Sequence, residues 1–67
     1  MNSDIKIYVL AFTASSVHEF EKLSNFYLES QPKKVKFFQF IEFKVVKWDV
    51  ANSYYGALLI YSGIKKT

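Results

Sequence analysis

The sequence contains no cysteine and no arginine, and it has only one histidine, His18, and one proline. Without cysteine the chain forms no disulfide bond, and a lone histidine without a cluster of carboxylates at ligand spacing argues against a metal site. The net charge of +3 is carried by nine lysines, which lack the bidentate guanidinium that recognises phosphates or bases specifically. The charge therefore favours anionic partners only mildly.

Long apolar runs are also absent from the sequence. No run approaches the ~20 residues of a membrane-spanning helix, and residues 1–4 lack the basic region that begins a signal peptide. We therefore expect a cytoplasmic protein that makes no use of a membrane.

Hydrophobic residues make up 51% of the chain and aromatic residues 19%, which is typical of a packed protein. The 67 residues form one domain, 1–67, and a core of this size is marginal on its own. Small chains compensate with disulfides, metals or oligomerisation. Because the first two are unexpected here, we expect a homodimer or a larger homo-oligomer.

Hydrophobic periodicity predicts four elements. Residues 5–12 alternate with period two and predict a strand. Ser16 and Glu19 match a capping box that begins a helix, and the segment around Pro32 ends it. Residues 35–48 and 54–61 predict two further strands, joined by a turn at 49–53, with Gly56 at a bulge or a close backbone approach. Residues 63–67 are expected to be a frayed basic tail.

The second predicted strand is unusually long. Fourteen extended residues span about 46 Å, whereas a compact chain of this length is about 28 Å across. The strand is therefore expected to bend at a bulge or to project beyond the domain.

The order of elements predicts an α+β fold, β-α-β-β, with a three-stranded sheet and one helix packed on one face. The helical connection favours a parallel or non-adjacent arrangement of the first two strands, and the turn favours a hairpin. One helix covers only one face of the sheet. We expect the second face to meet another subunit, unless the sheet curls on itself, with these candidate residues: Tyr8, Leu10, Phe12, Phe38, Phe40 and Trp48.

No group of residues predicts catalysis. His18 lies in the first helical turn without a partner, and the adjacent serines are interpreted as helix caps. Glu42 and Asp49 are about 23 Å apart on a straight strand, too far to act as an acid and base pair. We expect no enzymatic activity, no catalytic residue and no cofactor.

On the second predicted strand, Lys36 and Lys44 are expected to share a face with the aromatic residues Phe38, Phe40 and Trp48, a mixture that resembles the chemistry of single-strand or nucleotide binding. Lys33, Lys34 and Lys36 cluster after the helix, where they either complement the helix dipole or form a phosphate patch. The patch would be strengthened by Lys44 and Lys47 on the same sheet. The predicted ligand-binding residues are Lys36, Phe38, Phe40, Lys44, Trp48, Tyr54 and Tyr55, with the two tyrosines at a solvated rim.

Three segments resemble a small family from Bacillus and its phages that is usually labelled as sporulation proteins. They are residues 5–7 (IKI), 20–28 (FEKLSNFYL) and 54–61 (YYGALLIY). The element order is also similar to that of dodecin, a flavin-storing oligomer, and the size resembles phage-encoded sponge proteins that sequester cyclic nucleotide signals of bacterial immunity. These resemblances imply a phage-encoded oligomer in the cytoplasm of a bacterial host cell.

Three functions are consistent with these observations. The first is a non-enzymatic oligomeric protein that sequesters an anionic small molecule such as a cyclic nucleotide immune signal. The second is an inhibitor or accessory subunit that binds a host protein. The third is binding of single-stranded nucleic acid through the lysine and aromatic residues.

Overall fold

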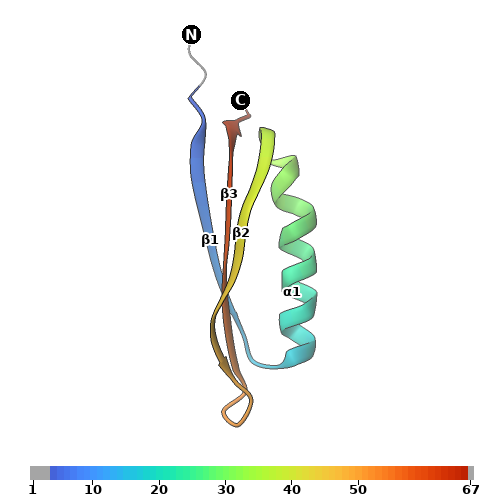
Figure 1. The fold of residues 1–67 in the computed structure, drawn as a ribbon. Coiled ribbons are helices and arrows are strands. Elements are labelled where there is room, and N and C mark those ends of the chain that lie inside the picture. The colour runs from blue at the N-terminus through green and yellow to red at the C-terminus, as the bar shows by residue number, and fades with distance from the viewer. Residues whose placement is uncertain (1–3, 67) are drawn as a thin grey trace.

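The chain forms one three-stranded sheet with a single helix on one face (Figure 1). This computed structural model describes residues 4–66. Strand β1 is Lys6–Ala14, helix α1 is Val17–Ser30, the 3-10 helix η1 is Gln31–Lys33, strand β2 is Val35–Asp49 and strand β3 is Tyr54–Lys65. The predicted α+β class and the order β-α-β-β are confirmed.

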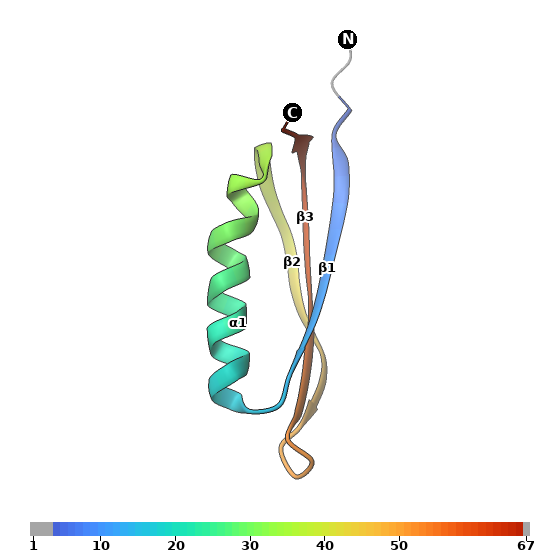
Figure 2. The ribbon, with the colours of Figure 1, turned by 180° about the vertical axis from the view of Figure 1, so that it is seen from behind.

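The order of strands in the sheet is β1-β3-β2, and both pairings are antiparallel. β3 is the central strand, so that β1 and β2 run in the same direction along the two edges (Figure 2). The predicted non-adjacent arrangement of the first two strands and the predicted β2–β3 hairpin are confirmed. Leu10, Leu59 and Phe43 lie in one row across the middle of the sheet.

The start of α1 is fixed by hydrogen bonds that the sequence predicted in part. Ser16 has an extended backbone, and its hydroxyl oxygen accepts a hydrogen bond of 3.1 Å from the backbone N–H of Glu19. The Glu19 carboxylate accepts from the backbone N–H and the hydroxyl of Ser15, at 2.7 and 2.8 Å. A capping box predicts that this carboxylate accepts from the backbone N–H of Ser16, so the predicted donor is wrong by one residue. These bonds to Ser15 lower the pKa of Glu19.

β2 is bulged as well as long. Its register with β3 shifts at three places: between Lys36 and Gln39, between Phe40 and Glu42, and between Val45 and Lys47. Each shift bends the strand and interrupts the alternation of its side chains. The third shift lies opposite Gly56, where a close approach was predicted. The predicted bulge in this strand is confirmed, and the molecule measures 51 × 17 × 15 Å, so the strand runs along an elongated fold rather than within a compact one.

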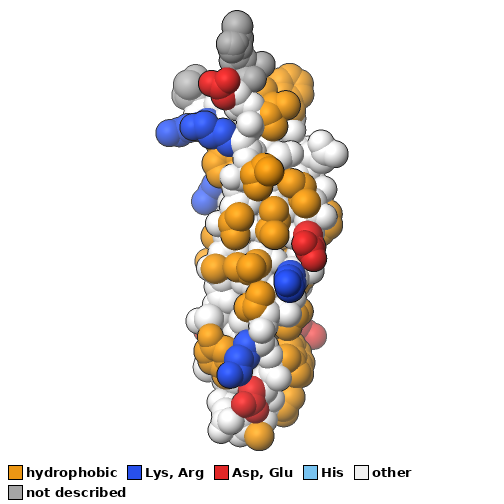
Figure 3. All heavy atoms as spheres, turned by 60° about the vertical axis from the view of Figure 1, so that its left-hand side comes forward, with side chains coloured by type: hydrophobic (Ala, Val, Ile, Leu, Met, Phe, Trp, Pro, Cys, Tyr) orange, Lys and Arg blue, Asp and Glu red, His pale blue; other side chains and the backbone are white. Residues whose placement is uncertain are grey.

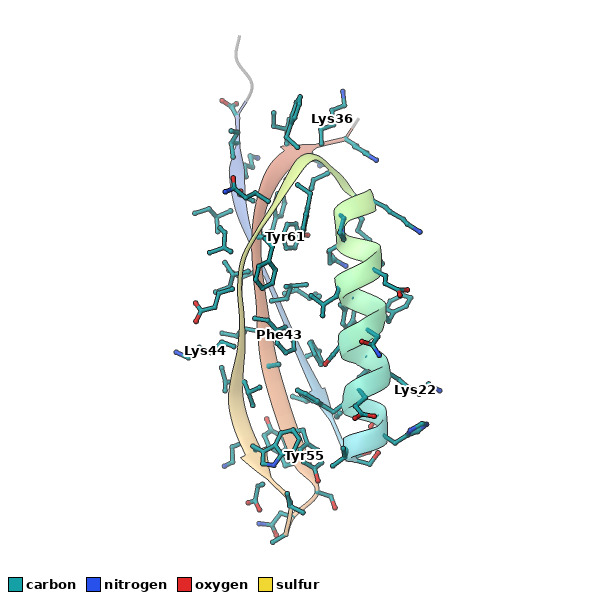
Figure 4. All side chains as sticks on the ribbon, turned by 45° about the vertical axis from the view of Figure 1, so that its right-hand side comes forward. Lys22, Lys36, Phe43, Lys44, Tyr55 and Tyr61 are labelled. Carbon is teal, nitrogen blue, oxygen red and sulfur yellow. The ribbon has the colours of Figure 1, made fainter. Side chains whose placement is uncertain are left out.

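The core lies between α1 and the sheet face that carries Tyr8, Leu10 and Phe12. Phe12 packs on Phe20 of α1 with ring centroids 5.7 Å apart, and Figure 4 shows Phe43, Tyr55 and Tyr61 between the sheet and α1. The sequence assigned this face of β1 to a second subunit, which is wrong. Both faces of β1 are apolar, and the larger aromatic side chains fill the gap beneath the helix.

β3 continues to Lys65, so the predicted frayed tail at 63–66 is wrong, while Thr67 lies outside the described residues. Gly63 pairs with Lys6 and lies against Val35 of β2. A Cβ atom at position 63 would be 2.5 Å from Val35 Cγ2, so only glycine fits. This close approach joins the end of β3 to the start of β2.

One buried hydrogen bond ties η1 to the centre of the sheet. The Tyr61 hydroxyl donates to Gln31 Oε1 at 2.7 Å, and both side chains are buried. Tyr61 also stacks on Tyr8, with ring centroids 5.3 Å apart. Burial, with a smaller contribution from Tyr8, raises the pKa of Tyr61.

Candidate functional site

The sheet face opposite α1 is uncovered in the single chain and is largely apolar. Ile5, which precedes β1, and Ile7 and Val9 of β1 are each about two-thirds exposed. Ile60 of β3 pairs with Val9 and therefore lies on the same face, where it is partly exposed. We call this surface the open face. Figure 3 shows apolar side chains along the length of the molecule on this side.

Charged side chains border the open face on β2. Glu42 pairs with Ile60 and Lys44 pairs with Leu58, so both belong to the open face. Lys44 points away from α1 in Figure 4. The open face thus combines an apolar strip over β1 and β3 with charges of both signs on β2.

A second feature is the end of the molecule where β1 and β2 begin and where α1 and β3 end (Figure 1). Six of the nine lysines gather there: Lys6, Lys33, Lys34, Lys36, Lys65 and Lys66. Their only acidic neighbours in the chain segments at this end are Asp4 and Glu29. Lys66 Nζ donates a hydrogen bond of 2.8 Å to the carbonyl oxygen of Lys33, which brings the last described residues against η1. We call these six lysines the basic end.

Phe37 lies at the first bulge of β2, beside Lys36 of the basic end. Its side chain is 79% exposed, the highest value among the exposed large apolar residues, and its φ is 56°. A bulky residue with positive φ is a conformational outlier and costs on the order of 1–3 kcal/mol. Phe38, the next residue, instead packs on Tyr61 with ring centroids 5.2 Å apart.

The structure separates the residues predicted to bind a ligand. Lys36 belongs to the basic end, whereas Lys44 lies on the open face and Trp48 lies near the β2–β3 turn. Phe38 and Trp48 face α1, since Phe38 contacts Tyr61 and Trp48 contacts Phe20. The expectation that Lys36, Phe38, Phe40, Lys44 and Trp48 share one face is wrong, because the bulges shift the alternation along β2.

The aromatic residues at the hairpin end belong partly to the core. Tyr55 is only 3% exposed, and Trp48 packs edge-on against it with ring centroids 4.6 Å apart. The predicted rim position of Tyr55 is therefore wrong. Tyr54 is exposed, and Lys47 Nζ lies 5.7 Å from the centroid of its ring. Phe40 is half exposed opposite Tyr61. Of the predicted aromatic ligand residues, Phe40, Trp48 and Tyr54 remain accessible to a partner.

The two serines beside the lone histidine in the sequence act at the start of α1. Ser15 and Ser16 make the helix-capping hydrogen bonds described above, as their interpretation as caps predicted. The described residues contain no group of three or more potential metal ligands and enclose no pocket. No helix in this part of the chain has the length and apolar character to cross a membrane.

The sequence indicated only half of the basic end and did not identify Phe37. Lys33, Lys34 and Lys36 are close in sequence, but Lys6, Lys65 and Lys66 join them through the sheet register. Regular strand alternation predicts only that Phe37 and Phe38 lie on opposite faces. The length of β2 predicted that this strand contains a bulge, but it did not indicate at which residue the bulge lies.

Comparison with protein-family models, curated proteins and solved structures finds no match to this chain. The resemblance to the sporulation-labelled family therefore stays a prediction. The functional argument rests on the open face and the basic end.

Proposed function

We propose that this protein is a non-enzymatic binding module that works as a homodimer and holds an anionic small molecule. The observation that carries the proposal is the open face, an apolar sheet surface that α1 leaves uncovered. The excess of lysines at one end supports an anionic ligand. The absence of a pocket within residues 4–66 favours a ligand held at the surface or between subunits.

The energetics of the open face support a second copy of the chain as its partner. Burying the exposed two-thirds of Ile5, Ile7 and Val9 contributes about 1–2 kcal/mol for each side chain. Ile41 and Val46 are each about half exposed on β2, and Val46 lies over Gly56, so this edge adds further apolar area. Two copies together gain on the order of 10 kcal/mol, which is within the range of the 4–15 kcal/mol cost of association. At the low end of that cost a net gain of about 6 kcal/mol remains, which corresponds to a weak dimer that forms at roughly 0.1 mM protein.

Charge favours an antiparallel packing of the two sheets. If the strands of the two copies ran in the same direction, the two basic ends would meet and repel each other. In the antiparallel arrangement the basic ends lie at opposite ends of the dimer. The twofold axis of such a dimer runs across the strands, between the two sheets. If it passes near Phe43, it brings Glu42 of each copy opposite Lys44 of the other.

Native mass spectrometry at a few hundred micromolar protein, above the dissociation constant estimated for the dimer, tests the assembly. We expect a dimer for the wild type and a monomer for Val9→Glu, because a carboxylate would be buried in the interface. Val50→Glu is the matched control, since Val50 is 61% exposed and Val9 is 62% exposed, but Val50 lies in the β2–β3 turn. A wild-type monomer, or an equal effect of the two substitutions, would remove the proposed dimer.

Calorimetry with cyclic di-AMP, ADP and inorganic pyrophosphate tests the anionic ligand. We expect binding of at least one phosphate compound at low salt and weaker binding as salt is raised, because the attraction is between exposed charges. Binding that does not depend on salt, or no binding by a dimeric wild type, would contradict the ligand part of the proposal.

A second candidate function is capture of a host protein through β1. All nine residues of β1 pair in regular register with β3, so its outer edge is straight, whereas β2 is bulged. A straight apolar edge accepts an additional strand from a partner. A monomeric wild type that binds no phosphate compound, and that recovers one protein lost with Val9→Glu, would favour this function.

A further inference from the structure

We propose that the basic end is a nucleotide site, in which the Phe37 ring stacks on the base and the lysines hold the phosphates. This inference rests on the proposed function, because it assigns a place and a chemical class to the anionic ligand. The observations that carry it are the clustered lysines and the one strained, exposed ring among them.

The six lysines come from four chain segments whose ends lie at the same end of the sheet. Lys6 begins β1, Lys33 and Lys34 surround the end of η1, Lys36 begins β2, and Lys65 and Lys66 end the described chain. The pairings of Val35 with Lys65 and of Lys36 with Ile64 align the start of β2 with the end of β3. The hydrogen bond from Lys66 to Lys33 then joins β3 to η1. Ammonium groups are compact point charges that suit phosphate oxygens.

The exposed ring of Phe37 is costly to the isolated chain in two ways. Its φ of 56° is unfavourable for a bulky residue, and its large apolar surface gains nothing from burial. Glycine or asparagine would adopt this backbone at lower cost. Residues held in such conformations are concentrated at binding and switch sites. A flat ring beside lysines provides the two contacts that nucleotides use, stacking and phosphate binding.

A single nucleotide fits this end better than a nucleic-acid strand. Binding of a strand uses several rings along a groove that follows the phosphate backbone. Here the charge is concentrated on one end of a rod that is 17 × 15 Å in cross-section, and the described residues form no pocket or groove along the sheet. Lys44 and Lys47 lie along β2 beside Glu42 and Asp49, so the basic surface does not continue. The ligand class is therefore a nucleoside phosphate with one stacked base.

Calorimetry at low salt with ADP, inorganic pyrophosphate and adenosine tests the two contacts separately. For Phe37→Gly we expect ADP to bind about 5- to 150-fold more weakly, the effect of one stacked base, with pyrophosphate binding unchanged. For the double variant Lys34→Ala and Lys36→Ala we expect both phosphate compounds to bind about 2- to 30-fold more weakly, the effect of two exposed charge pairs. Lys22→Ala, on the outer face of α1 (Figure 4), is the charge control, and Phe26→Ala, a 60% exposed ring on α1, is the ring control; both should leave ADP binding unchanged.

The Phe37→Gly variant also separates binding from folding. Because glycine accepts the positive φ, the variant should unfold at a higher temperature than the wild type while it loses ADP affinity. ADP binding equal to that of the wild type in Phe37→Gly would overturn the stacking site, even if the protein is a dimer that binds anions. Tighter binding of the oligonucleotide dT12 than of ADP would overturn the single-nucleotide class in favour of a strand. A dimeric wild type that binds pyrophosphate and ADP equally would overturn base recognition, and a monomeric wild type would instead contradict the proposed function.

Discussion

Replacement of Gly63 by alanine tests whether the close approach of β3 to β2 holds the basic end together. The new Cβ atom would lie 2.5 Å from Val35 Cγ2, 2.8 Å from Val35 Cβ and 3.1 Å from the carbonyl oxygen of Lys36. Val35 is buried and β-branched, and its Cβ atom cannot move away without the backbone. The two strands must therefore separate locally.

The size of the effect follows from two opposing contributions. Overpacking in a filled core costs roughly 1–3 kcal/mol, and alanine in a strand regains roughly 0.5–1 kcal/mol relative to glycine. We expect a net loss of about 1–2 kcal/mol, which corresponds to a melting temperature lower by about 5–15 °C in a domain of this size. Gly56→Ala is the matched control, because its nearest neighbour is Val46 Cγ2 at an ordinary contact distance of 3.5 Å.

Urea unfolding followed by the fluorescence of Trp48, the only tryptophan, measures this difference. All variants must be compared at one protein concentration, because the stability of a dimer depends on concentration. The free energy of unfolding should fall for Gly63→Ala and stay equal or rise for Gly56→Ala. Adding Val35→Ala should cost less in the Gly63→Ala protein than in the wild type, since it removes the overlapping methyl groups. Equal stability of the two alanine variants would refute the argument.

Three further predictions concern the core, the helix start and the dimer. Tyr61→Phe leaves the buried Gln31 Oε1 without its hydrogen bond and should lower the free energy of unfolding by about 1–3 kcal/mol in urea titrations; an unchanged value would contradict this. The pKa of Glu19 is lowered in the folded state, so its contribution to the free energy of unfolding is fully present above its ordinary pKa of 4.5 and is lost as the pH falls through the folded pKa. Glu19→Gln should therefore lower the melting temperature at pH 7 but not at pH 2, while Glu21→Gln serves as a control on the same helix; a difference that persists at pH 2 would count against the argument. Val9→Cys, the only thiol in its chain, should cross-link to its copy with a short bis-maleimide if the sheets are antiparallel, whereas cross-linking of Val50→Cys instead would indicate a parallel arrangement.

The sequence predicted the elements and their order because each depends on neighbouring residues. Ser16 and the segment around Pro32 fix the limits of α1, and the period of two identifies β1. The hairpin follows from the short turn before Tyr54. These features involve residues close in sequence, so periodicity and capping rules are sufficient.

The choice of the covered face and the composition of the basic end depend on contacts that are distant in sequence. Both faces of β1 are apolar, so alternation does not tell whether Leu10 or Val9 lies under the helix. The position of the β2 bulges decides that Phe37 is exposed and Phe38 is packed, and it depends on the pairing with β3. The sequence places Lys65 in a basic tail, whereas its pairing with Val35 makes it part of the sheet.

The unequal edges of the sheet also limit how far copies of this chain can assemble. Growth of a fibre through its edges requires the β1 edge of one copy to pair with the β2 edge of the next, a head-to-tail contact that repeats without end. The three register shifts along β2 make that edge a poor partner, whereas β1 is regular along all nine residues. Edge pairing is thus left with β1 against β1, a contact that uses the regular edge of both copies, so edge-to-edge pairing by itself ends at two chains. The bulges of β2 therefore act as a stop to polymerisation in a chain whose composition, rich in β-branched and aromatic residues, would otherwise favour amyloid-like fibres.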